Sequence, residues 1–411
     1  MKHCVFLLGI ILASASGSVF SAAYSQYGAV SGISSSIWNG KTGNDADSTA
    51  DFTFHADGNH RLSFTSWELF LHHVLNATDN AGTDTEWNYT VYEAFLRFFP
   101  VPVLSASAGR QRWSWGNGLL FSVSDSFQPN AFEASSGRIL ETQAENTEQS
   151  GFSGAGIGFY PTSDLSIQYG VDCRKALDDR HFSAGTLRTG FLLTGTSGPF
   201  DFFLSAVYGK NKTLRPGAGG SVDIAGLLFR IESAVEFGTS VERPVRSPDG
   251  TAYLDTDGSP LPMVSGGVEK DLYWDSFSFF LRTEYLFLAG GYTKNEQQLL
   301  ADHPELAIAA LSDRPSVLPD LYGTQYGTLA AEFELEDTWT IETLAVVDLT
   351  GPGVLVSNSV TWLGFGNITI KGSLLWHTGA PETEFAATDT ELSENENAGR
   401  YRFSLEVQYS F

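Results

Sequence analysis

The last eleven residues of the chain alternate without a break between apolar and polar side chains. The apolar or aromatic members are Tyr401, Phe403, Leu405, Val407, Tyr409 and Phe411, and the polar members are Arg402, Ser404, Glu406, Gln408 and Ser410. Successive side chains of a β-strand point to opposite faces, so residues 401–411 predict a strand with one apolar and one hydrated face. Half-buried strands of soluble sandwich proteins show the same alternation, so this strand alone does not distinguish a soluble sandwich from a membrane barrel. The rest of the chain has to distinguish them.

Runs of strand length recur along the chain and are joined by tight turns or by longer polar stretches. The expected strands cover residues 24–38, 52–57, 61–73, 87–99, 103–113, 151–160, 165–172, 187–196, 200–208, 222–230, 233–242, 263–273, 276–289, 322–335, 338–349, 354–364, 368–377 and 401–411. Stretches 210–220 and 243–262 are read as loops. The count is about eighteen strands, and about sixteen is the alternative, because element ends are the least reliable part of such a prediction.

The lengths of the connections test this architecture independently. If the first strand runs outward, long connections follow the odd-numbered strands and short turns follow the even-numbered ones, with 351–353 as the one short link on the outer side. Outer-membrane barrels combine short periplasmic turns, long external loops and an even strand number. A soluble sandwich has no reason to sort its loops in this way. The pattern therefore predicts an all-β fold, a transmembrane antiparallel up-and-down β-barrel.

Two stretches resemble known barrel families. The alternating strand that closes on Phe411 resembles the terminal strand of Gram-negative outer-membrane β-barrels. That resemblance implies residence in the cell outer membrane and recognition of Tyr409 and Phe411 by the barrel-assembly machinery. Residues 109–129, with Gly-Arg-Gln, then Trp-Gly, then Asp-x-Phe-x-Pro, are similar to a stretch found in uncharacterised porin-like barrels. The second resemblance implies kinship of fold and no particular substrate.

The amino terminus predicts a secretory signal. Lys2 precedes a short apolar run, 5–12, and small residues follow up to Ala23. The run is too short to span a bilayer, so we expect residues 1–22 to be a signal peptide and 23–411 to form the barrel. The barrel would then keep one cysteine, Cys173. One cysteine excludes an internal disulfide and a cysteine-rich metal site, and no cofactor is expected.

The formal net charge of −24 disfavours nucleic acid as the main partner, because phosphates call for Lys and Arg. The acidic residues are spread through loop-like segments. They can serve solubility alone, or they can attract cations to a pore mouth. The chain is also rich in aromatic residues, with 9 Trp, 15 Tyr and 30 Phe. Near strand ends we expect these rings to form the interface girdles of a barrel.

The long connection at 114–150 is the leading candidate for a constriction. It follows the fifth expected strand and is therefore the third external loop. Its position and length resemble those of the third loop of trimeric general porins, which folds into the pore and narrows it. Arg110 and Arg112 share one strand face, whereas Asp125 and Glu133 lie in the loop. If the loop folds inward, acids and arginines can oppose each other across the pore and select solutes by charge. The alternative is a solvated outer loop with Trp113 and Trp115 as interface anchors.

Strand alternation predicts further lumen-facing charges. They include Glu93, Arg97, Arg282, Glu284, Glu342, Arg402 and Glu406. The modest interpretation is that a wet lumen requires polar walls, and the sharper one is that acidic walls favour cations. A different kind of segment, 290–320, has helical composition that ends before Pro315 and is expected to be a long outer loop carrying a helix.

These observations favour a porin that lets small hydrophilic solutes diffuse passively, with a preference for cations and no enzymatic activity. A surface adhesin or a transporter of hydrophobic substrates is the alternative, and a barrel hydrolase is the weaker rival. His72 and His73 do not predict a metal pair, since neighbours on a strand face opposite ways. Expected partners are the lipid bilayer and the solutes, and a homo-oligomer is compatible with the sequence although no residue identifies a subunit face.

Overall fold

The computed structural model describes residues 23–39, 48–80, 86–111, 121–124, 152–173, 187–209, 213–312, 321, 323–336, 338–351, 353–364, 368–379 and 400–410. The first half of the wall consists of β1 (Ala23–Asn39), β2 (Ser48–Ser63), β3 (Trp67–Asn80), β4 (Glu86–Val101), β5 (Leu104–Gln111), β6 (Phe152–Thr162), β7 (Leu165–Asp172), β8 (Arg188–Ser197) and β9 (Phe200–Tyr208). The second half consists of β10 (Leu214–Ile224), β11 (Leu227–Glu236), β14 (Leu261–Tyr273), β15 (Phe277–Leu288), β16 (Gln325–Leu335), β17 (Trp339–Asp348), β18 (Gly353–Leu363), β19 (Ile368–Gly379) and β20 (Arg400–Ser410).

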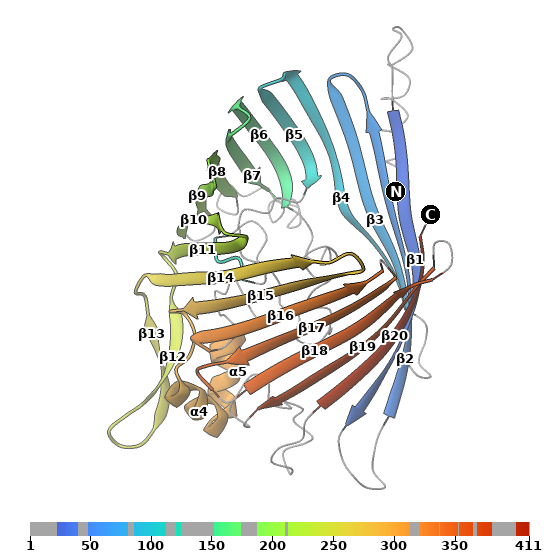
Figure 1. Cartoon of the computed structure of the whole chain (residues 1–411). Coiled ribbons are helices and arrows are strands. Elements are labelled where there is room, and N and C mark those ends of the chain that lie inside the picture. The colour runs from blue at the N-terminus through green and yellow to red at the C-terminus, as the bar shows by residue number, and fades with distance from the viewer. Residues whose placement is uncertain are drawn as a thin grey trace.

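The 18-stranded sheet is closed on itself (Figure 1). Each strand of this sheet pairs antiparallel with the next, with β11 pairing to β14 across the separate β12–β13 hairpin, and β20 pairs with β1 from Ala29–Ser410 to Asn39–Arg400. Closure leaves no strand edge with free backbone groups, which is the condition for a sheet in lipid. The prediction of an antiparallel up-and-down barrel of about eighteen strands is confirmed. One end of the barrel, here called the short-turn end, carries the tight turns, and the opposite long-loop end carries the long connections.

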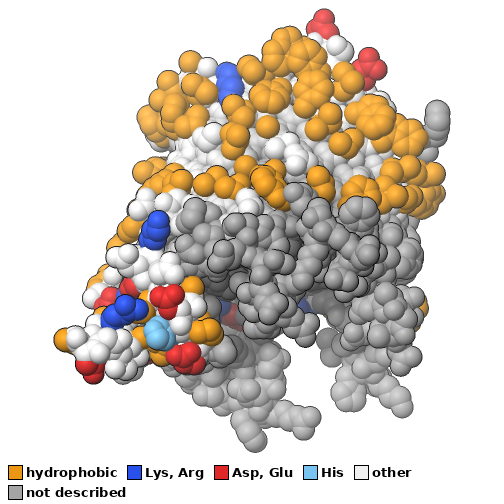
Figure 2. Space-filling model, turned by 90° about the horizontal axis from the view of Figure 1, so that it is seen from below, with side chains coloured by type: hydrophobic (Ala, Val, Ile, Leu, Met, Phe, Trp, Pro, Cys, Tyr) orange, Lys and Arg blue, Asp and Glu red, His pale blue; other side chains and the backbone are white. Residues whose placement is uncertain are grey.

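The outward face of the wall is apolar. On β11, Ile231 is 63% exposed while its neighbour Glu232 is 2% exposed, because the two side chains lie on opposite sides of the sheet. Figure 2 shows hydrophobic side chains gathered over the described part of the wall. Aromatic pairs lie at the short-turn end: Trp67–Phe98, Trp274–Phe277 and Trp339–Trp362. An apolar band bordered by aromatic rings is the surface that a membrane barrel presents to lipid.

Two segments read as loops contain strands. Residues 214–220 belong to β10, and the turn that follows is Ala225-Gly226, with φ of 56° and 73°. Two residues at positive φ make the tight hairpin turn that matches the twist of adjacent strands. The sequence interpretation had placed this turn between Arg230 and Ser233, because the glycines at 217–220 look like loop residues. Within 243–262, β12 (Val241–Arg246) and β13 (Ala252–Asp257) form a separate hairpin.

This hairpin and two helices form an outer module at the long-loop end (Figure 1). The helices α4 (Lys294–Asp302) and α5 (Pro304–Ser312) lie in the 290–320 segment, and a capping box of Thr293 and Glu296 starts α4. Neither helix is long and apolar enough to cross a membrane among the residues that the structure describes. The module has its own apolar core, formed by Val241, Leu261, Tyr292, Leu300 and Ala310.

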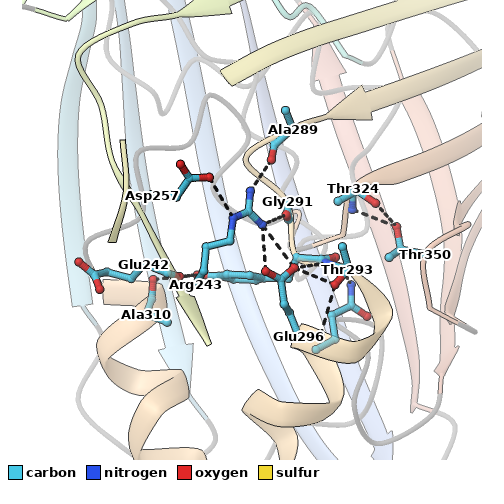
Figure 3. A network of polar contacts seen from close by, with 12 residues as sticks. Glu242, Arg243, Asp257, Ala289, Gly291, Thr293, Glu296, Ala310, Thr324 and Thr350 are labelled. Carbon is cyan, nitrogen blue, oxygen red and sulfur yellow. Dashed lines mark hydrogen bonds and ion pairs between the residues drawn. The ribbon is translucent and has the colours of Figure 1, made fainter. Parts of the chain in front are cut away.

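Arg243 joins the parts of the outer module (Figure 3). Its guanidinium donates to the carbonyls of Ala289 (2.6 Å) and Gly291 (2.8 Å). The same group lies 3.3 Å from Glu296 at the start of α4 and 3.7 Å from Asp257 on β13. One arginine therefore connects the hairpin, the end of β15 and the first helix.

Candidate functional site

The inner face of the barrel carries the candidate site, and its chemistry changes along each strand. On β15 the inward side chains of Ser278 and Glu284 are 9% and 7% exposed, whereas outward Tyr285 is 42% exposed. Further toward the long-loop end, the inward residues Leu286 and Leu288 are apolar and fully buried. A lumen wall that is charged at one end and apolar at the other has to be covered by something at its apolar end.

The cover is a short segment of the connection between β5 and β6. Residues 121–124 lie against the inner wall of β10, β11 and β15. The backbone nitrogen of Phe121 donates to Glu284 Oε2 at 3.2 Å. The hydroxyls of Ser122 and Ser124 donate to Glu232 Oε1 at 2.9 and 2.8 Å. These contacts place the described part of the third long connection inside the barrel.

The apolar side chains of this segment complete a dry core within the lumen. Phe121 and Val123 are both 0% exposed. They join an inward-facing cluster that extends from β11 to β19: Ala234, Met263, Leu286, Leu288, Leu321, Tyr326, Ala330, Leu344, Val346, Leu355 and Leu375. We call this cluster the inner core. It occupies the long-loop half of the wall, and there the lumen face of the strands is packed like a protein interior.

The wall is shaped to let the segment approach. A Cβ atom on Gly217 of β10 would lie 2.8 Å from Ser124 Cβ and 2.7 Å from Ser205 Oγ, closer than real Cβ atoms come. A glycine at this inward position therefore makes room for the segment. Arg215, two residues earlier on the same face, donates from its guanidinium to the carbonyl of Val123.

In the short-turn half, arginines and glutamates are organised in triads. Glu269 on β14 lies 3.3 Å from Arg230 on β11 and 3.5 Å from Arg282 on β15. Glu269 is directly opposite Arg282 in the strand register, and Arg230 is diagonal to it. The carboxylate thus neutralises one of the two positive charges at this part of the wall.

A second triad of the same kind lies on the other side of the barrel. Glu68 on β3 lies 2.5 Å from Arg61 on β2 and 3.5 Å from Arg97 on β4. Nine steps around the ring separate β3 from β14 in either direction, so the triads face each other across the lumen. In each triad one arginine also lies over a phenylalanine of its own strand, Arg97 over Phe95 at 5.0 Å and Arg282 over Phe280 at 6.0 Å.

A group of acids lies beside the first triad, on the strands that follow Arg282 of β15. Glu332 on β16 is directly opposite Glu342 on β17, and Glu334 is the next inward residue of β16. Ser278 donates to Glu334 at 2.7 Å, and Lys371 lies 3.3 Å from Glu342. Within the described residues, Glu332 makes neither a hydrogen bond nor an ion pair. Of the three acids in this group, only Glu342 has an ion-pair partner within 4 Å among the described residues, and Arg282 on β15 lies diagonal to Glu332 in the strand register.

Most of the predicted charges that the structure describes lie on the inner face. Arg97, Arg282, Glu284 and Glu342 make the contacts given above. Glu93 is opposite the inward His72, and Glu406 is opposite Lys371. Tyr409 faces outward and is 53% exposed.

Arg110 differs from its prediction. The register pairs it with Ala94, an exposed residue between the inward Glu93 and Phe95, so Arg110 shares the outward face at the end of β5. The sequence alone could not fix which face of this strand is inward, because small residues occupy both faces. Arg112, Asp125, Glu133 and Phe411 lie outside the described residues, as does the side chain of Arg402. Their predicted roles stay predictions.

The sequence interpretation missed Arg215, Glu232, Glu269 and Glu332. Glu232 was read as a turn residue, although alternation over 227–236 places it inward beside Arg230 and Ala234. Arg215 lay in the supposed loop. Glu332 alternates with the outward apolar residues Ala331 and Phe333, and that signal could have found it, whereas Glu269 is followed by Lys270 and its alternation is weaker. The alternation of apolar and polar residues does not predict which of these charged side chains form ion pairs with each other.

His72 and His73 point to opposite faces, as expected. His72 lies 3.1 Å from Asp57 on the inner face, and the ring of His73 stacks on His60 at 5.2 Å. Among the described residues no group of histidine, cysteine or acidic side chains is arranged to hold a metal ion.

No protein-family model matches the sequence, and no curated protein matches it. Solved structures do match by fold. OccK5 (OpdH) of Pseudomonas aeruginosa superposes with a TM-score of 0.52 at 10% identity, covering 94% of this chain and 98% of that chain. Acinetobacter baumannii OccAB1 gives 0.51 at 11% identity, covering 94% and 97%. The outer membrane protein OprD from Pseudomonas aeruginosa gives 0.50 at 8% identity, covering 94% and 93%. The chain thus shares its barrel fold with these proteins over nearly its whole length.

Proposed function

We propose that this protein is an outer-membrane channel for passive diffusion of small hydrophilic solutes, and that it prefers cations. The observation that carries the proposal is the closed barrel with an apolar outer wall and a charged inner wall in its short-turn half. A fold shared with an outer membrane protein supports the location. The bilayer would be its solvent and the barrel-assembly machinery its insertion partner. A homo-oligomer is compatible with this proposal.

The preference for cations follows from how the inner charges are paired. Glu269 and Glu68 each lie between two arginines and reduce the positive field of those pairs. Glu332, Glu334 and Glu342 have Lys371 and Arg282 as neighbouring cations, and Arg282 is shared with Glu269. A ring segment with excess carboxylates favours cations in a pore.

The test is the conductance of the purified protein in planar bilayers. A KCl gradient should give discrete openings and a zero-current potential of the sign that K⁺ preference produces. The double variant Glu332→Gln with Glu342→Gln should move that potential toward zero. Asp275→Asn, an exposed acid in the turn between β14 and β15, is the matched control and should leave it unchanged.

Two results would overturn this proposal. A protein that inserts but never conducts excludes the channel and favours the adhesin, the hydrophobic transporter or the hydrolase. Equal shifts from the lumen variant and the turn variant would reject a selective lumen, because only the first removes charge from the inner wall.

A further inference from the structure

Glu232 collects its contacts to the inward segment on one oxygen atom. Its Oε1 accepts from the hydroxyls of Ser122 and Ser124 and also from the backbone nitrogen of Ser124. Only 2% of the residue is exposed. Buried charged acceptors form stronger hydrogen bonds than neutral ones, and a buried carboxylate that loses its donors is destabilised. The bonds join two parts of the chain that are more than a hundred positions apart in sequence.

Both the apolar and the polar side chains of residues 121–124 contact the wall. Phe121 and Val123 place their side chains in the inner core, while Ser122 and Ser124 turn their hydroxyls to Glu232. Arg215 binds the carbonyl of Val123 from the adjacent strand and lies 3.9 Å from Glu236. The wall therefore offers an acceptor, a donor and an apolar surface that match this segment in one arrangement.

We infer that Glu232, supported by Arg215, is a positioning residue that fixes residues 121–124 against the wall and thereby sets the open cross-section of the channel. The inference rests on the proposed channel function. It differs from the charge selectivity proposed above, since Glu232 acts here on the position of a chain segment. With Glu232 released, the segment leaves the inner core and the long-loop half of the lumen widens.

All three hydrogen bonds to Glu232 need an acceptor oxygen but not a negative charge. Variants that keep or remove the oxygen can therefore separate the effect of hydrogen bonding from the effect of charge. Glu232→Gln keeps a carbonyl oxygen with two lone pairs that can still accept hydrogen bonds from this segment, whereas Glu232→Ala removes it. Glu269→Ala is the matched control, because it also deletes an inward, buried glutamate but one that is held by arginines. Ser122→Ala with Ser124→Ala is the second route, since it removes the hydroxyl donors and leaves Glu232 in place.

The rate at which a cysteine placed in the segment reacts with a thiol reagent reports the position of residues 121–124, and this measurement on the intact barrel does not depend on channel conductance. The reporter is Val123→Cys, fully buried in the structure, in a Cys4→Ser, Cys173→Ser background labelled with a water-soluble maleimide. Glu232→Ala and the double serine variant should label about tenfold faster or more, the factor that loss of one or two such hydrogen bonds implies. Glu232→Gln and Glu269→Ala should label at the parent rate. Equal protection in all variants overturns the inference, and so does Glu232→Gln labelling as fast as Glu232→Ala.

Single-channel recording supplies the second readout. Glu232→Ala should raise conductance and the size limit for neutral sugars, whereas Glu269→Ala should change ion selectivity and leave the size limit unchanged. Faster labelling with an unchanged size limit overturns the role in pore size. If the parent and every variant stay silent, the channel function itself fails, and the labelling result alone still shows whether Glu232 holds the segment.

Discussion

The two halves of the same lumen wall are built on opposite principles. In the long-loop half, inward residues such as Leu344 and Leu355 are apolar and buried under Phe121 and Val123. In the short-turn half, inward residues of the same strands are Glu332, Glu342 and their neighbours. Strand alternation decides only that a side chain points inward. Whether that position is wet or dry depends on a distant segment that covers it.

The comparison teaches that inward and polar are separate properties in this barrel. A pore whose whole inner face faced water would need polar residues along every strand. Here β17 over 344–347 and β18 over 353–356 are apolar on both faces, which is the composition of a strand buried on both sides. The inner core therefore stabilises the barrel from within.

The largest expected effect is on stability and comes from the dry half. Leu344→Ala removes a 0% exposed side chain from the inner core, and the cavity should lower the free energy of unfolding by about 2–5 kcal/mol. Leu329→Ala on the outward face of β16, 45% exposed, is the matched control and should cost much less. Guanidinium unfolding in detergent micelles measures both. Equal losses for the two variants would mean that the inner core is not packed.

The charged half should respond in selectivity as well as stability. Glu269→Ala leaves Arg230 and Arg282 without their shared carboxylate, so we expect weaker cation preference and a loss of about 1–3 kcal/mol in unfolding free energy. Glu68→Ala should cost less, because Arg61 and Arg97 are 54% and 37% exposed and water can solvate them. Zero-current potentials and unfolding curves give the two quantities. A larger stability loss for Glu68→Ala would reverse this ranking of the two triads.

The wall could be predicted from the sequence because it depends on short-range information. Alternation, as in 339–349, fixes which residues face lipid, and tight turns such as the one at 163–164 fix the hairpins. Loop lengths then fix the direction of every strand. The errors fall where small residues hide the period: glycines within 217–220 concealed β10 and moved the expected turn from 225–226 to 231–232, onto Glu232.

The inside of the barrel could not be predicted in the same way. Inward charges such as Arg282 and Glu284 were found because each belongs to its own strand pattern. The contact of Glu232 with Ser122 and Ser124 joins residues that no local pattern relates. Arg110 shows the reverse case, where a plausible charge pattern was assigned to the wrong face because both faces of its strand carry small residues.

The smallest expected effect concerns an ion pair outside the wall, which tests whether lumenal pairing is special. Asp257 on the outer hairpin lies 3.7 Å from Arg243, and the pKa of its carboxyl lies below the ordinary 3.8, chiefly because the backbone nitrogen of Ser259 donates to it and also because of Arg243. A lowered folded pKa means that this stabilisation is present above about pH 4 and is lost as the pH falls through the folded pKa. Hydrogen exchange of residues 241–257, corrected for intrinsic rates, should therefore quicken only in strong acid.

Asp257→Asn should remove that pH step and leave guanidinium unfolding of the barrel unchanged, since the carboxyl is open to water and its pair is screened. Asp249→Asn, in the hairpin turn, provides the local comparison, because its pKa is also lowered, first by the backbone nitrogen of Thr251, but without an arginine. If Asp257→Asn destabilised the whole barrel as strongly as Glu269→Ala, an ion pair on the inner wall would contribute no more to stability than an ion pair exposed to water. The contrast between the covered and the open parts of the molecule would then rest on apolar packing alone.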